Sequence, residues 1–356
     1  MTQSYPCSGC SADLKWSPGD AQLSCPYCGC TTPVVADSPE DAEAAVEELD
    51  LDEMLAKAPK GWAAEVSEFR CASCGALTAV EPQVTVSSCA FCGTTKVDLQ
   101  PAEGEILQPK GLLPFAVKRE TARSGFGGWV KSLWFRPNDL KRLARLDGLK
   151  GIYIPAFTFD MKTRTEWHAM AGYHYYVSMP DGKGGTKKVR RTRWEHASGL
   201  IRRDFDDWLV PATAGLSPQI FKGLLPYDTT GLVPYDNRYL AGFMAERYQV
   251  NLREAWDTGR AEMASVVHGL VVADIPGDTY RDLDYDIRSW DRTFKHCLLP
   301  VWIAAYRYKG EAYRFVVNGV TGKQTGTAPY SWIKITLAVL GAIGAIAGAV
   351  WLAQEA

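Results

Sequence analysis

Basic residues are scarce at the start of this chain. Residues 1–100 contain 5 Lys and Arg against 15 Asp and Glu, whereas residues 101–356 contain 34 basic and 26 acidic groups. Phosphate contacts require Lys and Arg, so the acidic first part is a poor starting point for a nucleic-acid binder. The basic remainder is suited to an anionic lipid surface, to an acidic partner, or to the chain's own acidic part.

A secretory signal is also missing, since Met1 to Trp16 has neither a basic start nor an apolar run. The ten cysteines are therefore expected in a reducing compartment, where thiolates stay available to bind metal. Disorder is excluded by a hydrophobic content of 46% and an aromatic content of 11%. The length allows two or three domains with a sizeable core.

Motifs of nucleotide-driven and nucleophilic enzymes are absent. The string Gly319–Gln324 has neither the spacing of a Walker A loop nor the Ser or Thr that follows its Lys. Asp282, Asp284 and Asp286 resemble the start of a calcium loop, but Ile287 stands where glycine is needed, and a solvated face is the favoured interpretation. No nucleophile elbow is recognisable. We therefore expect no catalytic residue and no helicase or ATPase activity, while an enzyme site of scattered residues stays an alternative.

Cysteine spacing provides the strongest motif. Two Cys-x2-Cys pairs separated by fourteen residues occur twice with identical spacing. The first set is Cys7, Cys10, Cys25 and Cys28, and the second is Cys71, Cys74, Cys89 and Cys92. Each Cys-x2-Cys turn supplies two sulfurs to one tetrahedral ion, so the spacing predicts two zinc ribbons holding two structural Zn2+ ions. Because the protein fills all four positions of each ion, catalysis at the metal is not expected.

Residues beside these cysteines support the same interpretation. Gly29, Gly75 and Gly93 follow cysteines, where a turn with positive φ directs backbone N–H groups toward the sulfurs. Cys30 lies two residues beyond a ligand and is expected to be a bystander. Cys297 lies beside an apolar stretch and is expected to be a core thiol.

An uncharged run of nineteen residues, Ile335–Ala353, lies near the end of the sequence. As a helix rising about 1.5 Å per residue it spans roughly 28 Å, close to the ~30 Å of a hydrocarbon core. Tyr330, Trp332 and Trp351 are placed as interface aromatics are. With Lys334 on the N-terminal side, the positive-inside rule predicts a single-pass tail anchor in the cell membrane, with the preceding domains in the cytoplasm.

Small residues within that run form a candidate helix-packing face. They are Gly341, Gly344 and Gly348. Such residues allow close contact with a partner helix and so predict an oligomer through the membrane helix. Ordinary lipid-facing sequence is the alternative interpretation.

Composition and periodicity divide the chain into five parts. They are zinc ribbon 1 at residues 1–35, an acidic linker at 36–65, zinc ribbon 2 at 66–100, an α+β body at 101–328 and the membrane anchor at 329–356. The linker is either a solvated spacer or a segment that docks on a basic surface, with a short amphipathic helix. The body is expected to have mainly antiparallel strands.

Local patterns predict the elements of the body. Strands are expected within 152–159, 166–178, 299–308 and 313–320, helices at 116–134, 137–147 and 251–272, and a hairpin tip at Asp181–Gly185. The segments Ile154–Phe157 and Leu299–Trp302 share a Pro-x-aromatic core, so the body is a candidate for two related subdomains.

Two basic stretches of the body are candidates for binding an anionic surface. The first covers residues 110–150 and includes Trp129 and Trp134. The second flanks the hairpin tip and consists of Lys187, Lys188, Arg190, Arg191 and Arg193. Membrane lipid, nucleic acid and plain solvent each stay open as what these stretches meet.

The paired ribbons, the segments Leu299–Tyr308 and Tyr313–Gly322, and the closing apolar helix resemble a bacterial family of TFIIB-type zinc-ribbon membrane proteins. Its members are often labelled primosomal protein N′ (replication factor Y)-like helicases. Similar proteins work beside SPFH (flotillin-like) and phage-shock A-type proteins, so the resemblance implies a membrane scaffold that recruits protein partners. Helicase activity is not carried over, because the Walker motifs are missing. A membrane-tethered nucleic-acid-binding protein is the alternative.

Overall fold

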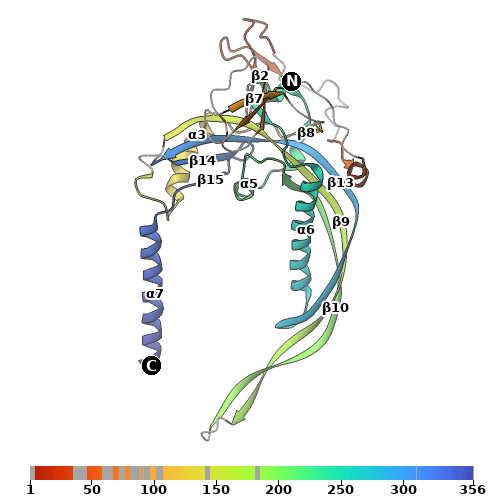
Figure 1. The fold of residues 1–356 in the computed structure, drawn as a ribbon, viewed down its shortest axis with the longest axis vertical. Helices are drawn as coiled ribbons and strands as arrows, with labels where there is room; N and C mark the ends of the chain where they lie inside the picture. Colours follow the sequence, from red (N-terminus) through yellow and green to blue (C-terminus); the bar gives the residue numbers. More distant parts are fainter. Residues whose placement is uncertain are drawn as a thin grey trace.

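One large, curved β-sheet forms a half-barrel in this mixed α+β protein (Figure 1). The computed structural model describes residues 5–34, 46–57, 67–71, 77–80, 89, 91, 97–101, 107–140, 145–180, 185–309 and 311–355. A separate three-stranded sheet lies in the first cysteine unit and consists of β1 (Lys15–Ser17), β2 (Gln22–Ser24) and β3 (Thr31–Pro33). The expected α+β class is confirmed.

Three long strands form the centre of the large sheet. They are β9 (Arg145–Pro180), β10 (Thr186–Pro211) and β13 (Thr279–Tyr308). β9 lies between the other two and pairs antiparallel with both. Residues 152–161 of β9 are all buried, so both faces of the strand are covered there. From 161 to 169 buried and exposed residues alternate, as in a strand with one solvated face.

Register shifts interrupt the pairing of these strands at four places. Three lie beside Asp207, Asp282 and Asp291, whose φ angles are 49°, 52° and 51°, and the fourth lies between Ile303 and Ala305. Asp tolerates the left-handed region better than most residues, because its short polar side chain bonds locally. A bulge adds one residue to one strand and increases the local bend and twist, which explains how the sheet curves.

Shorter strands extend the sheet on both sides. They are β4 (Leu49–Asp50), β5 (Ser67–Cys71), β6 (Leu77–Val80), β7 (Val97–Pro101), β8 (Gly111–Leu112), β11 (Val233–Pro234), β12 (Met244–Glu246), β14 (Glu311–Asn318) and β15 (Gln324–Gly326). Among the pairs in the described part of the chain, β12 with β9 and β8 with β13 are parallel and the others are antiparallel. The segments Ile154–Phe157 and Leu299–Trp302 lie on neighbouring strands of this sheet, with Leu299 opposite Ile154.

Two of the three expected helices lie wholly within the described residues, whereas residues 141–144 of the third lie outside them. α3 (Arg119–Ser132) and α6 (Leu252–Asp274) confirm the predictions at 116–134 and 251–272. The helix expected at 137–147 is wrong at its end, because Arg145–Asp147 pair as a strand with Ala305–Arg307 of β13. Long-range pairing overrides local helical propensity at these residues. The remaining helical elements are α2 (Leu51–Ala56), α5 (Pro218–Leu224), η1 (Thr229–Gly231), η2 (Asn237–Leu240) and α7 (Trp332–Glu355).

α6 covers the inner side of the long strands (Figure 1). A capping box between Asn251 and Glu254 begins the helix. Its buried face includes Trp256, Met263 and Val267, which recur at helical spacing and pack with the strands in one hydrophobic cluster.

A two-stranded arm continues beyond the sheet. Pairing of β13 with β9 stops at Thr279 and Gly172, so within the described part of the chain residues 173–180 and 186–193 pair only with each other. Pro180 lies opposite Thr186, which confirms a hairpin there, although most of the tip at 181–185 lies outside the described residues. Figure 1 shows the arm extending toward the same end of the molecule as α7.

Candidate metal centre and membrane helix

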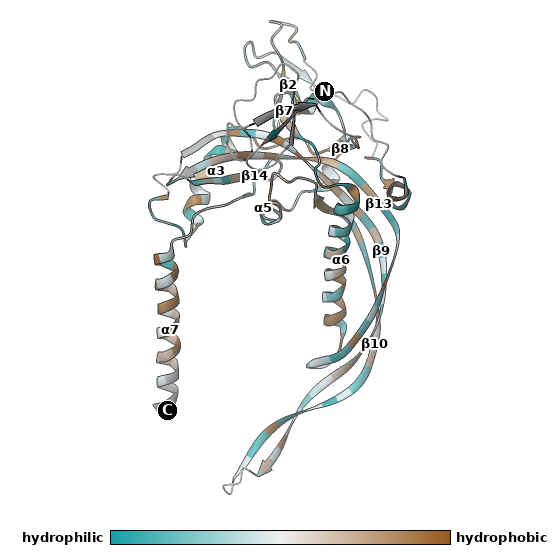
Figure 2. Cartoon of the chain, in the orientation of Figure 1, coloured by the Kyte–Doolittle hydropathy of each residue, from teal (hydrophilic) through white to brown (hydrophobic). Residues whose placement is uncertain are grey.

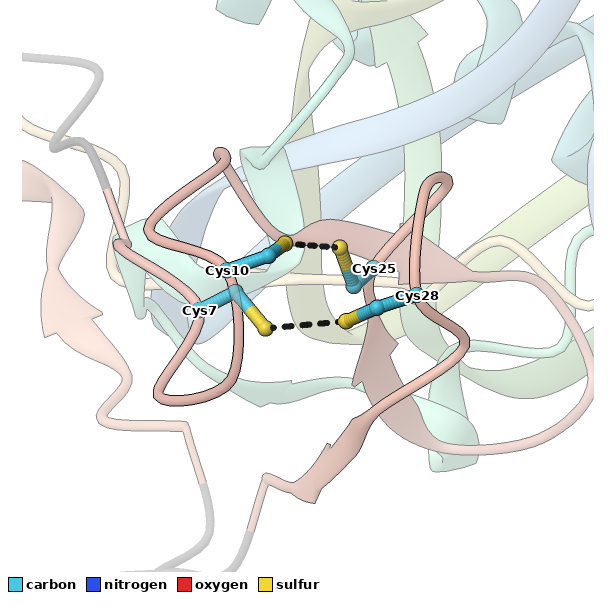
Figure 3. A group of neighbouring side chains, drawn as sticks. All are labelled: Cys7, Cys10, Cys25 and Cys28. Carbon is cyan, nitrogen blue, oxygen red and sulfur yellow. Dashed lines mark hydrogen bonds between the residues drawn. The ribbon is translucent and has the colours of Figure 1, made fainter.

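The four cysteines of the first set converge on one point, as Figure 3 shows. The sulfurs of Cys7, Cys10, Cys25 and Cys28 all lie within 4.8 Å of one another. Cys7 Sγ is 3.4 Å from Cys28 Sγ, and Cys10 Sγ is 3.4 Å from Cys25 Sγ. Four thiolates around a tetrahedral Zn2+ at about 2.3 Å stand about 3.8 Å apart, so this donor set fits one zinc ion.

Backbone N–H groups prepare this set for a cation. The N–H of Gly9 lies 3.4 Å from Cys7 Sγ, and donation from Gly9 and Cys10 lowers the pKa of the Cys7 thiol. The N–H groups of Cys28 and Tyr27 lower the pKa of the Cys25 thiol to about 6. Thiolates are the zinc-binding form, so at Cys7 and Cys25 these N–H groups favour the protonation state that the metal requires.

A glycine turn follows the second pair, as expected. Gly29 has a φ of 75°, and its N–H donates to Cys25 O at 3.1 Å. Ser11 has the same role after the first pair, with a φ of 60° and donation to Cys7 O at 2.8 Å. Gly75 and Gly93 lie outside the described residues.

Cys30 lies closer to the cluster than its sequence position indicated. A Cβ built on Gly9 is 3.0 Å from Cys30 Sγ, 3.7 Å from Cys28 Sγ and 3.9 Å from Cys7 Sγ, so these three sulfurs surround Gly9. The Cys28 sulfur raises the pKa of the Cys30 thiol to about 11. Cys30 therefore stays a neutral thiol at the rim of the cluster.

Ribbon 1 is fixed to the body through Trp16. This side chain is 5% exposed, and its indole N–H donates to Phe115 O at 3.2 Å. Its ring centroid lies 4.7 Å from that of Tyr239. Cys7 and Cys25 share the same hydrophobic cluster, so the metal turns and the body form one packed unit. Tyr27, at the outer turn, is 82% exposed.

Two cysteines of the second set lie within the described residues. Cys71 and Cys89 are 2% and 6% exposed and belong to one hydrophobic cluster with Phe91. Cys74 and Cys92 lie outside the described residues. One four-cysteine site is therefore shown, and the second zinc ion stays a prediction. Cys297 is fully buried in the same cluster, which confirms the core thiol, and burial raises its pKa to about 12.

Part of the acidic linker docks on the body. We name residues 46–57 the acidic clasp: β4 pairs with β13, and Leu51 is fully buried. Three of its carboxylates face basic side chains: Glu47 with Lys110 at 2.9 Å, Glu48 with Lys295 at 3.0 Å and Asp52 with Arg292 at 2.8 Å. In this stretch the linker meets a basic surface of its own chain rather than solvent alone.

A polar cluster under the acidic clasp joins Lys295, Asp207 and Asp160. Lys295 Nζ lies 2.8 Å from Asp207 Oδ1, and although burial lowers the pKa of Lys295, Asp207 and Glu48 raise it overall. Asp160 accepts from the Asp207 N–H at 2.5 Å and from the Thr293 hydroxyl at 3.1 Å. Burial raises the pKa of Asp160 to about 6.

α7 is long and apolar enough to cross a membrane. Its 24 residues rise roughly 36 Å as a helix. None of the apolar stretch Trp332–Ala349 is buried against the described residues, so α7 is not a core helix of the body. Figure 2 shows α7 as hydrophobic along most of its length, whereas the arm alternates with hydrophilic residues.

The candidate packing glycines of α7 face open space. A Cβ on Gly341, Gly344 or Gly348 meets no atom within 4 Å among the described residues. Contact between two membrane helices thus stays a prediction. The basic set Lys187, Lys188, Arg190, Arg191 and Arg193 lies exposed on the arm, where Arg193 pairs with Glu195 at 2.9 Å.

Comparison with known proteins reveals one distant similarity of considerable length. The chain is 26% identical over 251 residues to the Uncharacterized protein YdjG of Bacillus subtilis (strain 168), covering 70% of this chain and 71% of that protein. No family model matches the chain, and no solved structure matches it. The similarity supports distant homology, and that protein's name states no activity.

Proposed function

We propose that this protein is a membrane-anchored zinc-ribbon adaptor that recruits protein partners from the cytoplasm. The observation that carries the proposal is the presence, on one chain, of a four-cysteine site without an open ligand position and an exposed apolar helix. A closed site of four cysteines stabilises a surface rather than performing chemistry. An apolar helix without a protein cover needs lipid.

The partner surface that ribbon 1 offers is its outer turn. Trp16 occupies the inner side of the ribbon against the body, and this leaves Tyr27 projecting with 82% of its surface exposed. Tyrosine is enriched at the energetic centres of protein interfaces. The resemblance to proteins that work beside SPFH (flotillin-like) and phage-shock A-type proteins suggests partners of the membrane-stress class.

Purification of the tagged full chain from its own membranes in mild detergent, with and without nuclease, tests this proposal. We expect protein partners that survive nuclease treatment. Tyr27→Ala should reduce their recovery at least about tenfold while zinc content and membrane location stay unchanged. Tyr176→Ala, an exposed aromatic on the arm, is the matched control and should retain the partners. Equal recovery from both variants would remove Tyr27 from the interface.

A second variant tests the other ribbon. Cys71→Ser together with Cys74→Ser should unfold ribbon 2 and release partners, while the protein stays in the membrane. If the variant instead leaves the membrane, the assignment of partner binding to the ribbons and of membrane attachment to α7 is contradicted.

The exposed basic arm favours one rival, a membrane-tethered nucleic-acid-binding protein. That function requires binding of DNA or RNA that weakens steeply with salt, because phosphate contacts release counterions. A protein that binds no DNA or RNA at low salt would contradict this second hypothesis. If the tagged chain co-purifies mainly with nucleic acid, and protein partners are lost after nuclease treatment, the nucleic-acid-binding function is supported and the adaptor function is contradicted.

A further inference from the structure

Four large aromatic side chains project into solvent where the body meets α7. We name Trp134, Phe135, Tyr330 and Trp332 the aromatic foot. Their exposed fractions are 78%, 43%, 62% and 75%. The first two belong to the turn after α3, Tyr330 lies just before α7 and Trp332 begins it, so segments almost two hundred residues apart form one patch.

Backbone and side-chain contacts hold the two segments together. The Ser331 N–H donates to Phe135 O at 2.8 Å. The Arg136 guanidinium lies 3.8 Å from the centroid of the Tyr330 ring and donates to Ala328 O at 2.5 Å. All these contacts involve residues before α7, so the turn stays beside the chain's entry into the helix whatever angle α7 takes.

The turn itself is fixed from the body side. Trp129 and Val130 at the end of α3 are buried in the same hydrophobic cluster as Trp16, and Leu140 after the turn is fully buried in that cluster. The N–H of Leu133 donates to Val130 O at 3.4 Å. Trp134 is therefore held outward between two anchored points.

Basic groups border the aromatic foot. Lys334 Nζ donates to Trp134 O at 3.1 Å, Arg136 covers Tyr330, and Lys131 is exposed one residue before the end of α3. Indole and phenol rings beside Lys and Arg are the composition of a protein surface at the level of lipid headgroups. The rings partition into the interface, and the cations meet anionic headgroups.

We infer that the aromatic foot is a bilayer-contact surface of the folded body, in which Trp134 and Phe135 insert among lipid headgroups. The inference rests on the proposed membrane anchor. It adds a second contact with the bilayer, supplied by the turn after α3 rather than by α7. Two contacts on one rigid body restrict its tilt above the membrane, whereas a single helix leaves the tilt free.

Photo-cross-linking in the full chain tests this inference. A benzophenone amino acid is placed separately at positions 134 and 135, at Ile343 within α7 and at Tyr27 on ribbon 1. Each protein is reconstituted in nanodiscs of phosphatidylethanolamine and phosphatidylglycerol, irradiated, and analysed by mass spectrometry for lipid adducts. Ile343 and Tyr27 are 57% and 82% exposed, so accessibility alone does not separate them.

We expect lipid adducts at positions 134, 135 and 343, with yields at least about tenfold above those at position 27. Adducts at 343 without adducts at 134 or 135 would overturn the inference and leave the anchor standing. Adducts at 134 or 135 to a second copy of the chain would also overturn it, since the patch would then join two copies. Absence of adducts at 343 as well would overturn both the inference and the anchor.

Discussion

Cys28 and Cys30 are two residues apart and both exposed, yet they differ in chemistry. Cys28 Sγ belongs to the four-sulfur cluster, whereas Cys30 has its pKa raised at the rim. We expect Cys28→Ser to lower the zinc content by about one ion per chain, because a set of three cysteines binds far more weakly, and Cys30→Ser to retain it. Metal analysis of the two purified variants checks this. Loss of zinc from Cys30→Ser, with zinc retained in Cys28→Ser, would mean that Cys30 rather than Cys28 is the ligand.

Asp160 predicts a pH dependence of stability. Burial raises its pKa from an ordinary value of 3.8 to about 6, so between these values the folded state binds more protons than the unfolded state. Stability from this group is then fully present below the ordinary value and is lost as the pH rises through about 6. Asp160→Asn should remove that loss and gain about 1 kcal/mol at neutral pH, allowing for lost attraction to Lys295.

Unfolding midpoints in detergent, measured from pH 4 to 8 by tryptophan fluorescence, check this expectation. The Asn oxygen still accepts the Asp207 N–H, so the fold should persist. Asp206→Asn, at an exposed position of the same strand as Asp207, is the control and should leave the profile unchanged. An Asp160→Asn protein whose midpoint falls at neutral pH would show that attraction to Lys295 outweighs the burial of the charge.

Among the elements, the acidic clasp is the one whose removal is most informative. Leu51 is the fully buried residue of the clasp, so Leu51→Asp places a charge in the hydrophobic cluster. This change should detach residues 46–57 and lower the free energy of unfolding by about 2–5 kcal/mol. Hydrogen exchange should then rise in the acidic clasp and in the β13 residues it covers. Asp52→Asn removes only a surface ion pair and should cost less than about 1 kcal/mol. Unchanged exchange in Leu51→Asp would mean that the ion pairs alone hold the clasp.

Sequence reasoning found those elements whose pattern is local. The amphipathic spacing of Trp256, Met263 and Val267 suffices to predict α6, and the apolar run suffices to predict α7. The docking of the acidic clasp was one of two interpretations of the linker, but its pairing with β13 and the first residues of β9 were missed because distant partners decide them. Residues 145–147 contain helix formers, yet they extend as a strand because β13 offers an open edge. Nothing within residues 46–57 shows that Phe294 and Thr293 complete the pairing.

The candidate site was predictable to a similar depth. Cysteine spacing alone indicated the four ligands of ribbon 1 and the turn at Gly29. The proximity of Cys30 depends on how the turn at Cys25–Cys28 folds back over Gly9. The spacing of the cysteines in the sequence does not specify this. Only part of the aromatic foot could be predicted from the sequence. Trp134 and Trp332 become neighbours through the path of α3 and the last strands, which no local pattern specifies.

At the scale of the whole molecule, α7 and the basic arm extend toward the same end (Figure 1). The arm carries exposed Lys187, Lys188, Arg190 and Arg191. Each such charge at the bilayer centre costs about 2.5–3.5 kcal/mol or more, so the arm stays in water when α7 enters lipid. We therefore expect α7 to turn relative to the body after Ser331, which brings the arm to the leaflet on the ribbon side.

A topology measurement checks this expectation. A specific protease site is inserted after Gly185 at the base of the arm tip, and a second is placed after Glu355, in proteoliposomes of the full chain with one defined orientation. Protease on the ribbon side should cut the arm and spare the end of α7, because the two lie across the bilayer from each other. Cleavage at both sites from the ribbon side would mean that α7 lies along the membrane instead of crossing it. Cleavage of the arm only from the opposite side would contradict the argument from charge, since the arm would then have crossed the lipid that its lysines and arginines should exclude.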